Sequence, residues 1–334
     1  MPIVNGAYNA PTWNNNAPPA IDASELQDMC DTIETYSTQK ANVSLVNTFV
    51  RPNLLDNWYF VGGGSQQGGG QFPVNQRGST LYTLTGMSLD RWRTASYNGL
   101  GDIAVNADGV KLTHGDGGYI DFHQTIEDVQ RINGKEVTVS AMVDGVVYSN
   151  TFTVGATGYV AFGNLSMHRI NPGSDANANV FLLRASDSTG GTIQAVKLEL
   201  GSTQTLAHQE NGVWVLNEIP NYQQELARCQ RYYQNLNLTG DNYVAVGLNT
   251  AQSSTKANVV LYLPVAMRTT PTVGTTGSWT LVNGQTAFSV TNITVDRFYG
   301  TMLKLAVTAS GMTTGTAVLL EANGAGTITL SADL

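Results

Sequence analysis

The chain has 334 residues, with 17 lysines and arginines against 25 aspartates and glutamates, so its formal net charge is −8. An acidic chain without a basic patch is not expected to bind nucleic acid. The sequence contains no run of about 18 apolar residues, so insertion into a membrane is not predicted. Only 13% of the residues are charged, where about 25% is usual, and Gly, Asn, Thr and Ser fill the difference. This composition predicts an all-β protein, and the length predicts two or three domains.

Residues 1–20 are rich in Asn, Pro and Ala and are expected to be extended. Proline removes backbone donors and restricts the residue before it, which excludes a helix or a central strand here. Such a segment becomes ordered when a partner orders it. We therefore interpret it as an attachment segment in which Trp13 is the main contact, flanked by Pro11 and Pro18. A disordered tail is the alternative.

A short helix is predicted within residues 21–50, because Asp22 is a good N-cap and Glu25 follows three residues later. Apolar side chains recur on heptad positions, as expected for the seam of a three-fold bundle. These seam residues are Leu26, Met29, Ile33, Tyr36 and Val43. The alternative is an amphipathic helix packed on its own domain.

From residue 51 to residue 201 the pattern becomes β. Residues 136–143 alternate, Asp144-Gly145 gives a type I′ turn signal, and residues 146–151 return, so a hairpin is predicted. Further short runs at 159–162, 180–184 and 193–200 complete the pattern of an antiparallel sandwich.

Residues 202–239 are predicted to be a linker with a second short helix. Asn221 is its expected cap and Gln224 completes a capping box. One face of this helix is predicted to carry Tyr222, Leu226, Cys229 and Tyr233. Cys229 and the other cysteine, Cys30, are expected to be free thiols on packed helix faces, which fits synthesis in a reducing compartment.

Residues 240–334 are again β, with about seven short strands and many threonines, so a second compact sandwich is predicted. The predicted fold is thus mainly all-β. Two antiparallel, jelly-roll-like β-sandwich domains follow an extended N-terminal segment and a short helix.

Residues with catalytic or metal-binding chemistry give weak signals. The four histidines are dispersed, and no nucleophile or zinc motif is present. Asp116 and Asp121 flank Tyr119 and leave open a glycan hydrolase that uses an aspartate pair. Residues 175–179 alternate oxygen-bearing side chains, so a structural calcium ion is an open alternative. No other cofactor is expected.

Aromatic residues are more informative, because exposed Trp and Tyr rings stack on the apolar faces of sugars. Most aromatic residues are expected to belong to the cores. Trp279 stands next to Gly277-Ser278 and Tyr299 next to Gly300, so both are expected at exposed turns. With Tyr243, they are the predicted glycan contacts.

Three stretches resemble phage and prophage tail proteins. The first resembles the start of tail fibres: Pro11-Thr12-Trp13-Asn14-Asn15-Asn16-Ala17-Pro18, then Ile21-Asp22-Ala23-Ser24-Glu25-Leu26 and Ile33-Glu34. The second resembles the carbohydrate-binding-module-like sandwich of phage tail proteins: Asn53-Leu54-Leu55-Asp56-Asn57-Trp58-Tyr59-Phe60, Pro73-Val74-Asn75-Gln76-Arg77-Gly78 and Leu89-Asp90-Arg91-Trp92. The third is similar to the closing strand and exit segment of that module: Lys197-Leu198-Glu199-Leu200-Gly201 and Glu225-Leu226-Ala227-Arg228-Cys229-Gln230-Arg231-Tyr232-Tyr233.

The resemblance implies a receptor-binding tail fibre subunit, usually a homotrimer, whose N-terminus attaches to a baseplate or tail. It implies jelly-roll domains and a glycan receptor on a bacterial surface. It also implies that Trp58 and Trp92 belong to the framework of the module. The absence of a secretory signal fits particles that assemble in the cytoplasm and leave by lysis.

We therefore expect a non-enzymatic virion component, located in the tail, that attaches a phage or phage-like particle to bacterial surface glycan. The alternatives are a tail-associated glycan hydrolase and a secreted carbohydrate-binding adhesin.

Overall fold

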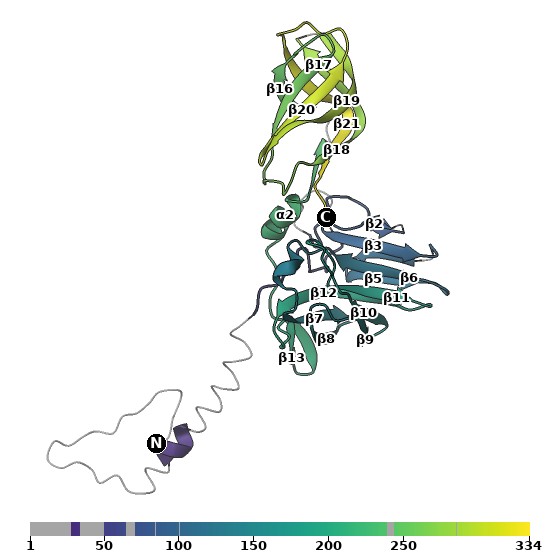
Figure 1. The fold of residues 1–334 in the computed structure, drawn as a ribbon, viewed down its shortest axis with the longest axis vertical. Coiled ribbons are helices and arrows are strands. Elements are labelled where there is room, and N and C mark those ends of the chain that lie inside the picture. Colours follow the sequence, from purple (N-terminus) through teal and green to yellow (C-terminus); the bar gives the residue numbers. More distant parts are fainter. Residues whose placement is uncertain are drawn as a thin grey trace, which may run out of the picture. The chain divides into compact units, whose positions relative to one another are not determined.

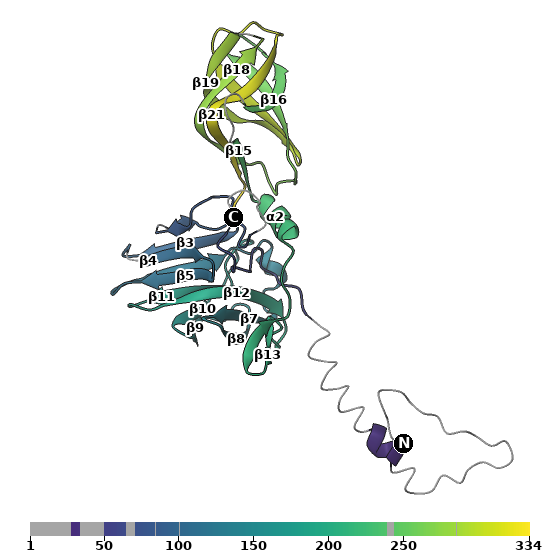
Figure 2. The same cartoon turned by 180° about the vertical axis from the view of Figure 1, so that it is seen from behind.

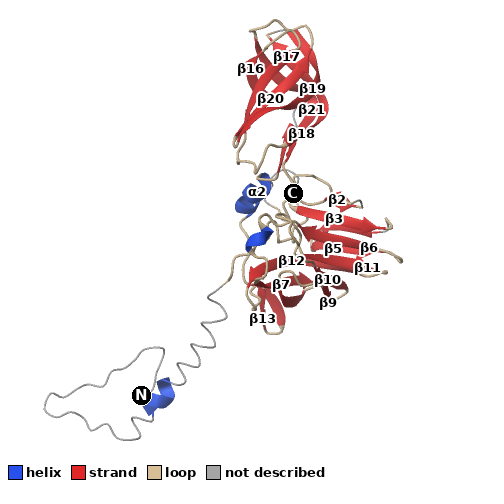
Figure 3. Ribbon diagram, in the orientation of Figure 1, coloured by secondary structure: helices blue, strands red, loops and turns tan. Residues whose placement is uncertain are grey.

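The computed structural model describes residues 28–33, 50–64, 71–83, 85–99, 101–238, 244–284 and 286–334. The chain divides into two units, Met1–Arg51 and Pro52–Leu334. Strands dominate the described part of the second unit (Figure 3). The predicted all-β class is confirmed.

Residues 81–200 contain a sandwich of two six-stranded antiparallel sheets (Figure 1). The first sheet has the order β1 (Leu81–Tyr82), β4 (Gly101–Asn106), β5 (Gly109–His114), β12 (Gly190–Leu200), β7 (Glu136–Val143) and β8 (Val146–Thr153). The second has the order β2 (Gly86–Met87), β3 (Trp92–Tyr97), β6 (Tyr119–Gln124), β11 (Phe181–Ser186), β10 (Leu165–Arg169) and β9 (Gly158–Phe162). A 3₁₀ helix, η1 (Val129–Arg131), follows β6.

The sandwich encloses one apolar core. Alternation along each strand sends every second side chain inward, as for Trp92 in β3, Phe122 in β6 and Leu183 in β11. The rings of Trp92 and Phe122 stack with centroids 4.4 Å apart. Burial of apolar side chains such as these is the main favourable contribution to folding.

The hairpin predicted from Asp144-Gly145 is confirmed as β7 and β8. Both turn residues have positive φ, 49° and 77°, as a type I′ turn requires. Other strand pairs join segments that are far apart in the sequence. β12 lies between β5 and β7, and its pairing with β7 shifts register between Ile193 and Ala195.

Asn57 connects its own segment to three others, which contain Val74, Asp90 with Trp92, and Glu225. Its buried side chain donates to the carbonyl oxygens of Val74 and Asp90, at 2.8 and 2.9 Å, and accepts from Val74 N. Its backbone N–H donates to a carboxylate oxygen of Glu225 at 2.7 Å, and its carbonyl accepts from Trp92 Nε1 at 2.8 Å. Residues 53–60, 73–78, 89–92 and 225–233 therefore meet at one buried asparagine with φ 51°.

A hairpin and a helix follow the sandwich. The hairpin, β13 (Ala207–Glu210) and β14 (Val213–Leu216), lies in the region predicted to be a linker. The helix, α2 (Tyr222–Gln230), begins as predicted, since Asn221 accepts from the backbone N–H groups of Gln223 and Gln224.

The prediction of which residues form the apolar face of α2 is wrong in two respects. Glu225 is buried on that face together with Cys229, because its carboxylate bonds Asn57 N and Arg228. Burial raises the pKa of Glu225, and these bonds oppose that shift. Tyr233 does not continue the helix but begins β15.

Residues 233–331 form a seven-stranded antiparallel sheet in the order β15, β21, β18, β19, β20, β17, with β16 also paired to β21. Its strands are β15 (Tyr233–Leu238), β16 (Val244–Thr250), β17 (Lys256–Tyr262), β18 (Thr272–Asn283), β19 (Thr286–Tyr299), β20 (Met302–Ala309) and β21 (Ala317–Ser331).

The sheet curls so that its strands enclose a second core (Figures 1 and 2). β19 connects the two sides of the curled sheet. Its first residues pair with β18, and from Val290 onward it pairs with β20. Bulges between Val290 and Asn292 and between Val295 and Arg297 bend the strand. The expected short strands are thus replaced in part by long, bent ones.

Side-chain contacts join Tyr232, Tyr233 and Asp333 to Arg77 and Glu127. Arg77 pairs with Asp333 at 2.6 Å and covers the ring of Tyr233, with its guanidinium carbon 3.9 Å from the ring centroid. Tyr232 donates to Glu127 at 2.8 Å. These contacts are largely polar, as in many interfaces between domains of one chain.

Several predicted features lie wholly or partly outside the described residues. They are the attachment residues Pro11, Trp13 and Pro18, the seam residues Leu26, Tyr36 and Val43, and Tyr243. Residues 28–33 are helical, and Met29 and Ile33 are exposed on them. Cys229 is a buried free thiol as predicted, but Cys30 is exposed rather than packed.

Replacing Asn57 by alanine should lower the free energy of unfolding by about 3–5 kcal/mol, since several buried polar groups lose their partners at once. Asn98→Ala is the matched control, because Asn98 also has positive φ (65°) but is exposed. That control should cost about 1 kcal/mol, the usual penalty of the left-handed region. Urea unfolding measures both, and equal losses would contradict the role of Asn57 as a junction.

Candidate functional site

The outer face of the second sheet of the sandwich gathers aromatic and charged side chains from neighbouring strands. Cross-strand partners point to the same side of a sheet. Tyr97 in β3 pairs with Tyr119 in β6, and Asp121 in β6 pairs with Arg184 in β11. On the same side, His168 in β10 pairs with Tyr159 in β9. We call this set of six residues the tyrosine–arginine face.

Arg184 and Asp121 hold the centre of this face. Arg184 Nε donates to Asp121 Oδ1 at 2.6 Å, and Nη2 donates to Oδ2 at 2.8 Å. The pair is therefore bidentate, the strongest arrangement of these two side chains. Asp121 is buried, and the pair fixes the plane of the guanidinium.

The fixed guanidinium lies against two tyrosines. Its carbon is 3.6 Å from the centroid of the Tyr119 ring and 5.7 Å from that of Tyr159, both within the range of cation–π contacts. Arg184 Nη1 also donates to the hydroxyl oxygen of Tyr159 at 3.2 Å. The two rings are thus held close together although they come from strands that are not neighbours.

Each end of the face adds a stacked pair of rings. Tyr97 stacks on Tyr119 with centroids 5.4 Å apart and an angle of 16° between planes. Tyr159 stacks on His168 at 4.0 Å and 14°. Tyr97 and Tyr159 are 55% and 57% exposed, so each presents much of its surface to solvent.

Two histidines of the same sheet side are kept neutral. Burial, together with Arg93, lowers the pKa of His123 to about 4. Burial and the positive charge of Arg184 lower the pKa of His168. A neutral imidazole carries one donor and one acceptor nitrogen, which suits a hydroxyl-bearing ligand better than a charged one.

The arrangement is suited to binding. Exposed rings on a rigid sheet stack on apolar ligand faces, and the guanidinium, phenol and imidazole groups between them bond hydroxyls. The rings are held by neighbours, so little conformational entropy is lost when a ligand binds.

The expected exposure of Trp279 is wrong. Its side chain is 6% exposed and belongs to the second core, and its Nε1 donates to Thr276 O at 2.9 Å. Gly277 and Ser278 form a bulge inside β18 rather than a turn. Gly277 has φ 79° there, and a Cβ atom would lie 2.5 Å from Ala325 O. The bulge turns the Trp279 ring inward.

The other aromatic predictions have mixed outcomes. Tyr299 is 57% exposed, as expected. Trp58 and Trp92 are buried, in agreement with the framework role that the family resemblance implies. Trp92 contributes to the Asn57 junction through its indole N–H.

The carboxylates of Asp116 and Asp121 accept hydrogen bonds from different residues. Both carboxylate oxygens of Asp121 accept from Arg184, and Asp116 accepts from the Ser188 hydroxyl. A glycan hydrolase needs one carboxylic acid to donate a proton and one carboxylate to act as base or nucleophile. A carboxylate held in a bidentate arginine pair is poorly suited to either role.

Within the described residues, no group of three His, Cys, Asp or Glu side chains is arranged to hold a metal ion. In the segment 175–179, where a structural calcium ion is an open alternative, two oxygens accept hydrogen bonds from protein donors. Asp175 O accepts from Gln130 Nε2 at 2.7 Å, and Asn179 Oδ1 accepts from Thr125 at 3.3 Å.

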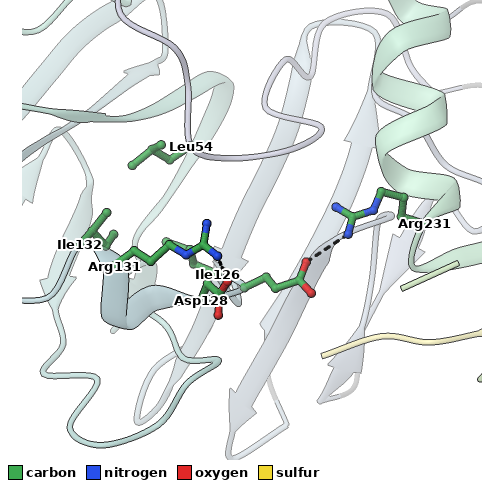
Figure 4. A pocket seen from close by; sticks show the side chains of 7 residues that line it. Leu54, Ile126, Asp128, Arg131, Ile132 and Arg231 are labelled. Atoms are coloured by element: carbon green, nitrogen blue, oxygen red, sulfur yellow. Dashed lines mark ion pairs between the residues drawn. The ribbon is translucent and has the colours of Figure 1, made fainter. Parts of the chain in front are cut away.

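A pocket of about 420 Å³ opens near η1 (Figure 4). It is lined by Leu54, Ile126, Glu127, Asp128, Arg131, Ile132 and Arg231. Its charged groups pair with one another, Arg131 with Asp128 at 2.9 Å and Arg231 with Glu127 at 3.5 Å. Glu127 also accepts from Tyr232. The pocket is therefore a weaker candidate for recognition than the tyrosine–arginine face.

The sequence alone did not single out Tyr97, Tyr159, His168 or Arg184. The signal that could have found Arg184 and His168 is the alternation of polar and apolar residues in 183–186 and 165–168, which places both side chains outside. Which strands lie side by side is not readable from that alternation.

Comparison with known proteins finds no family model and no curated protein that matches this chain. None of the helices in the described ranges combines the length and the apolar character needed to cross a bilayer.

Trp279→Ala should lower the free energy of unfolding by about 3–5 kcal/mol, because it removes a buried ring from the second core. Tyr299→Ala is the matched control and should change it by less than about 0.5 kcal/mol, as for an exposed residue. Chemical unfolding of the two variants makes the comparison. A small loss for Trp279→Ala would show that the ring is not part of the core.

Proposed function

We propose that this chain is an attachment subunit of a phage or phage-like particle and that its sandwich binds a bacterial surface glycan on the tyrosine–arginine face. The observation that carries the proposal is the row of rings held by Arg184. Tyr97 and Tyr119 lie on one side of its guanidinium, and Tyr159 and His168 on the other.

The chemistry of the face supports a sugar ligand. Pyranose rings have apolar faces that stack on aromatic side chains, and hydroxyl groups that bond the polar groups between them. The positive charge of Arg184 is balanced by Asp121, and His123 and His168 are neutral. A largely uncharged saccharide therefore fits this face best.

The tail location, the homotrimer, and attachment through Pro11, Trp13 and Pro18 belong to the same proposal. They rest on the resemblance of residues 11–34 to the start of tail fibres and on the apolar heptad positions from Leu26 to Val43. Three copies on one particle would multiply weak individual contacts into firm attachment.

Binding is favoured over hydrolysis because Asp121 is engaged by Arg184 on both oxygens. The same ion pair that disables a carboxylate as a catalyst fixes the platform on which the rings are held.

Tyr97→Ala and Tyr159→Ala should each weaken binding to the recognised glycan about tenfold, the effect of losing one stacking contact of about 1.4 kcal/mol. The measurement is binding to a panel of purified bacterial surface polysaccharides, with adsorption to cells as a second readout.

Leu81→Ala is the control, because Leu81 is an exposed apolar residue of the other sheet, in β1. If wild-type protein binds a member of the panel and both tyrosine variants bind it equally well, the tyrosine–arginine face is not the binding site.

A further inference from the structure

The C-terminal sheet has a second exposed aromatic surface, on the outer side of β17, β20 and β19. Met302 in β20 pairs with Tyr262 in β17 on one side and with Tyr299 in β19 on the other. The three side chains therefore form one row across three adjacent strands. Neighbouring strands lie about 4.8 Å apart, so the two tyrosines are about 10 Å apart.

Both tyrosines of this row are open to solvent. Tyr262 is 80% exposed, the largest value among the exposed large apolar and aromatic side chains of the described residues, and Tyr299 is 57% exposed. Single exposed aromatic residues need no explanation, but two in one row beside a methionine form a contiguous exposed patch.

The next row on the same outer face carries positive charge. Lys304 pairs across the strands with Arg297, two residues further along from Met302 and Tyr299. Lys256 lies on β17, further along the same face. One carboxylate, Asp296, lies between the lysines, 3.0 Å from Lys304 Nζ and 3.8 Å from Lys256 Nζ.

Three cations against one carboxylate give this region a local charge of +2 on a chain whose net charge is −8. The hydrogen bond from Lys304 lowers the pKa of Asp296, so the carboxylate stays ionised at neutral pH. Arg297 is exposed, and its polar contact is a long one, 3.5 Å from Nη1 to the hydroxyl oxygen of Tyr299. Its guanidinium keeps donors for an external anion.

We propose that Tyr262, Met302, Tyr299, Arg297 and Lys304 form a second saccharide site that takes an acidic polysaccharide. The tyrosines stack on sugar rings, while Arg297 and Lys304 bind the anionic groups carried by those rings. Rows two residues apart are about 7 Å apart along a strand, so the charged row lies about 7 Å from the aromatic row. The arginine fork favours carboxylate or phosphate groups over neutral hydroxyls.

This second site differs in ligand class from the tyrosine–arginine face, where the charge of Arg184 is balanced. It rests on residues of a different sheet and does not depend on the function proposed for that face.

The test is titration calorimetry of the full chain at low salt with oligogalacturonate, in which each sugar ring bears a carboxylate. Wild-type protein should bind it and should not bind neutral malto-oligosaccharides of the same length. Tyr262→Ala and Tyr299→Ala should each weaken binding about tenfold, and Lys304→Gln should weaken it and reduce its dependence on salt.

Lys111→Gln is the charge-matched control, because Lys111 is exposed on β5 of the sandwich. It should leave oligogalacturonate binding unchanged. Inorganic polyphosphate separates charge from stacking: weaker binding than oligogalacturonate, unaffected by the tyrosine substitutions, is expected.

The proposal is overturned if wild-type protein does not bind oligogalacturonate, if the neutral oligosaccharide binds equally well, or if the tyrosine substitutions have no effect. It is also overturned if the Tyr262→Ala, Tyr299→Ala double variant has a lower mass in solution than wild type by light scattering. That result would make this surface a contact between copies of the chain.

Discussion

The buried hydrogen bonds of Asn57 are the constraint on which the sandwich and its outer face depend. They join the segment before the first strand, the loop at Val74, the turn at Asp90 and the helix α2. They also receive the indole N–H of Trp92, the first residue of β3. Trp92 is thereby fixed with its ring in the core.

The position of Trp92 determines which side chains of β3 point into the core and which point outward. Side chains alternate along a strand, so with Trp92 inward, Tyr97 points outward. A slip of one residue would send Tyr97 into the core and expose Trp92. The same alternation, passed from strand to strand by pairing, brings Tyr119, Arg184 and Tyr159 to the outer side. The core and the proposed binding face are therefore two consequences of one register.

The two proposed binding surfaces both combine exposed tyrosine rings with an arginine, but they differ in local charge. On the sandwich, Arg184 is neutralised by Asp121 and serves to hold rings in place. On the C-terminal sheet, Arg297 and Lys304 exceed the single carboxylate of Asp296. The two proposals therefore assign saccharides of different charge to the two surfaces.

Local signals in the sequence predicted the local structure well. The Asp144-Gly145 turn and the Asn221 cap formed as expected, because each is determined by a few neighbouring residues. The all-β class followed from composition and alternation. The inward turn of Trp279 did not follow, because a Gly-Ser pair signals a turn and a strand bulge equally well.

The candidate site was harder to predict for a different reason. Tyr97, Arg184 and Tyr159 are far apart in the sequence and meet only through the strand order β3, β6, β11, β10, β9. That order depends on which strands pair, and pairing depends on packing of the whole core. The burial of Glu225 on α2 was not predictable for the same reason. It depends on the contact with Asn57, which is 168 residues away in the sequence.

The most direct test of the account is hydroxyl-radical footprinting of the wild-type chain with and without a bacterial surface polysaccharide that it binds. Bound polysaccharide should reduce oxidation of Tyr97 and Tyr159, while the exposed residue Val213 of β14 keeps its rate. Unchanged oxidation of both tyrosines under saturating polysaccharide would contradict the assignment of the tyrosine–arginine face.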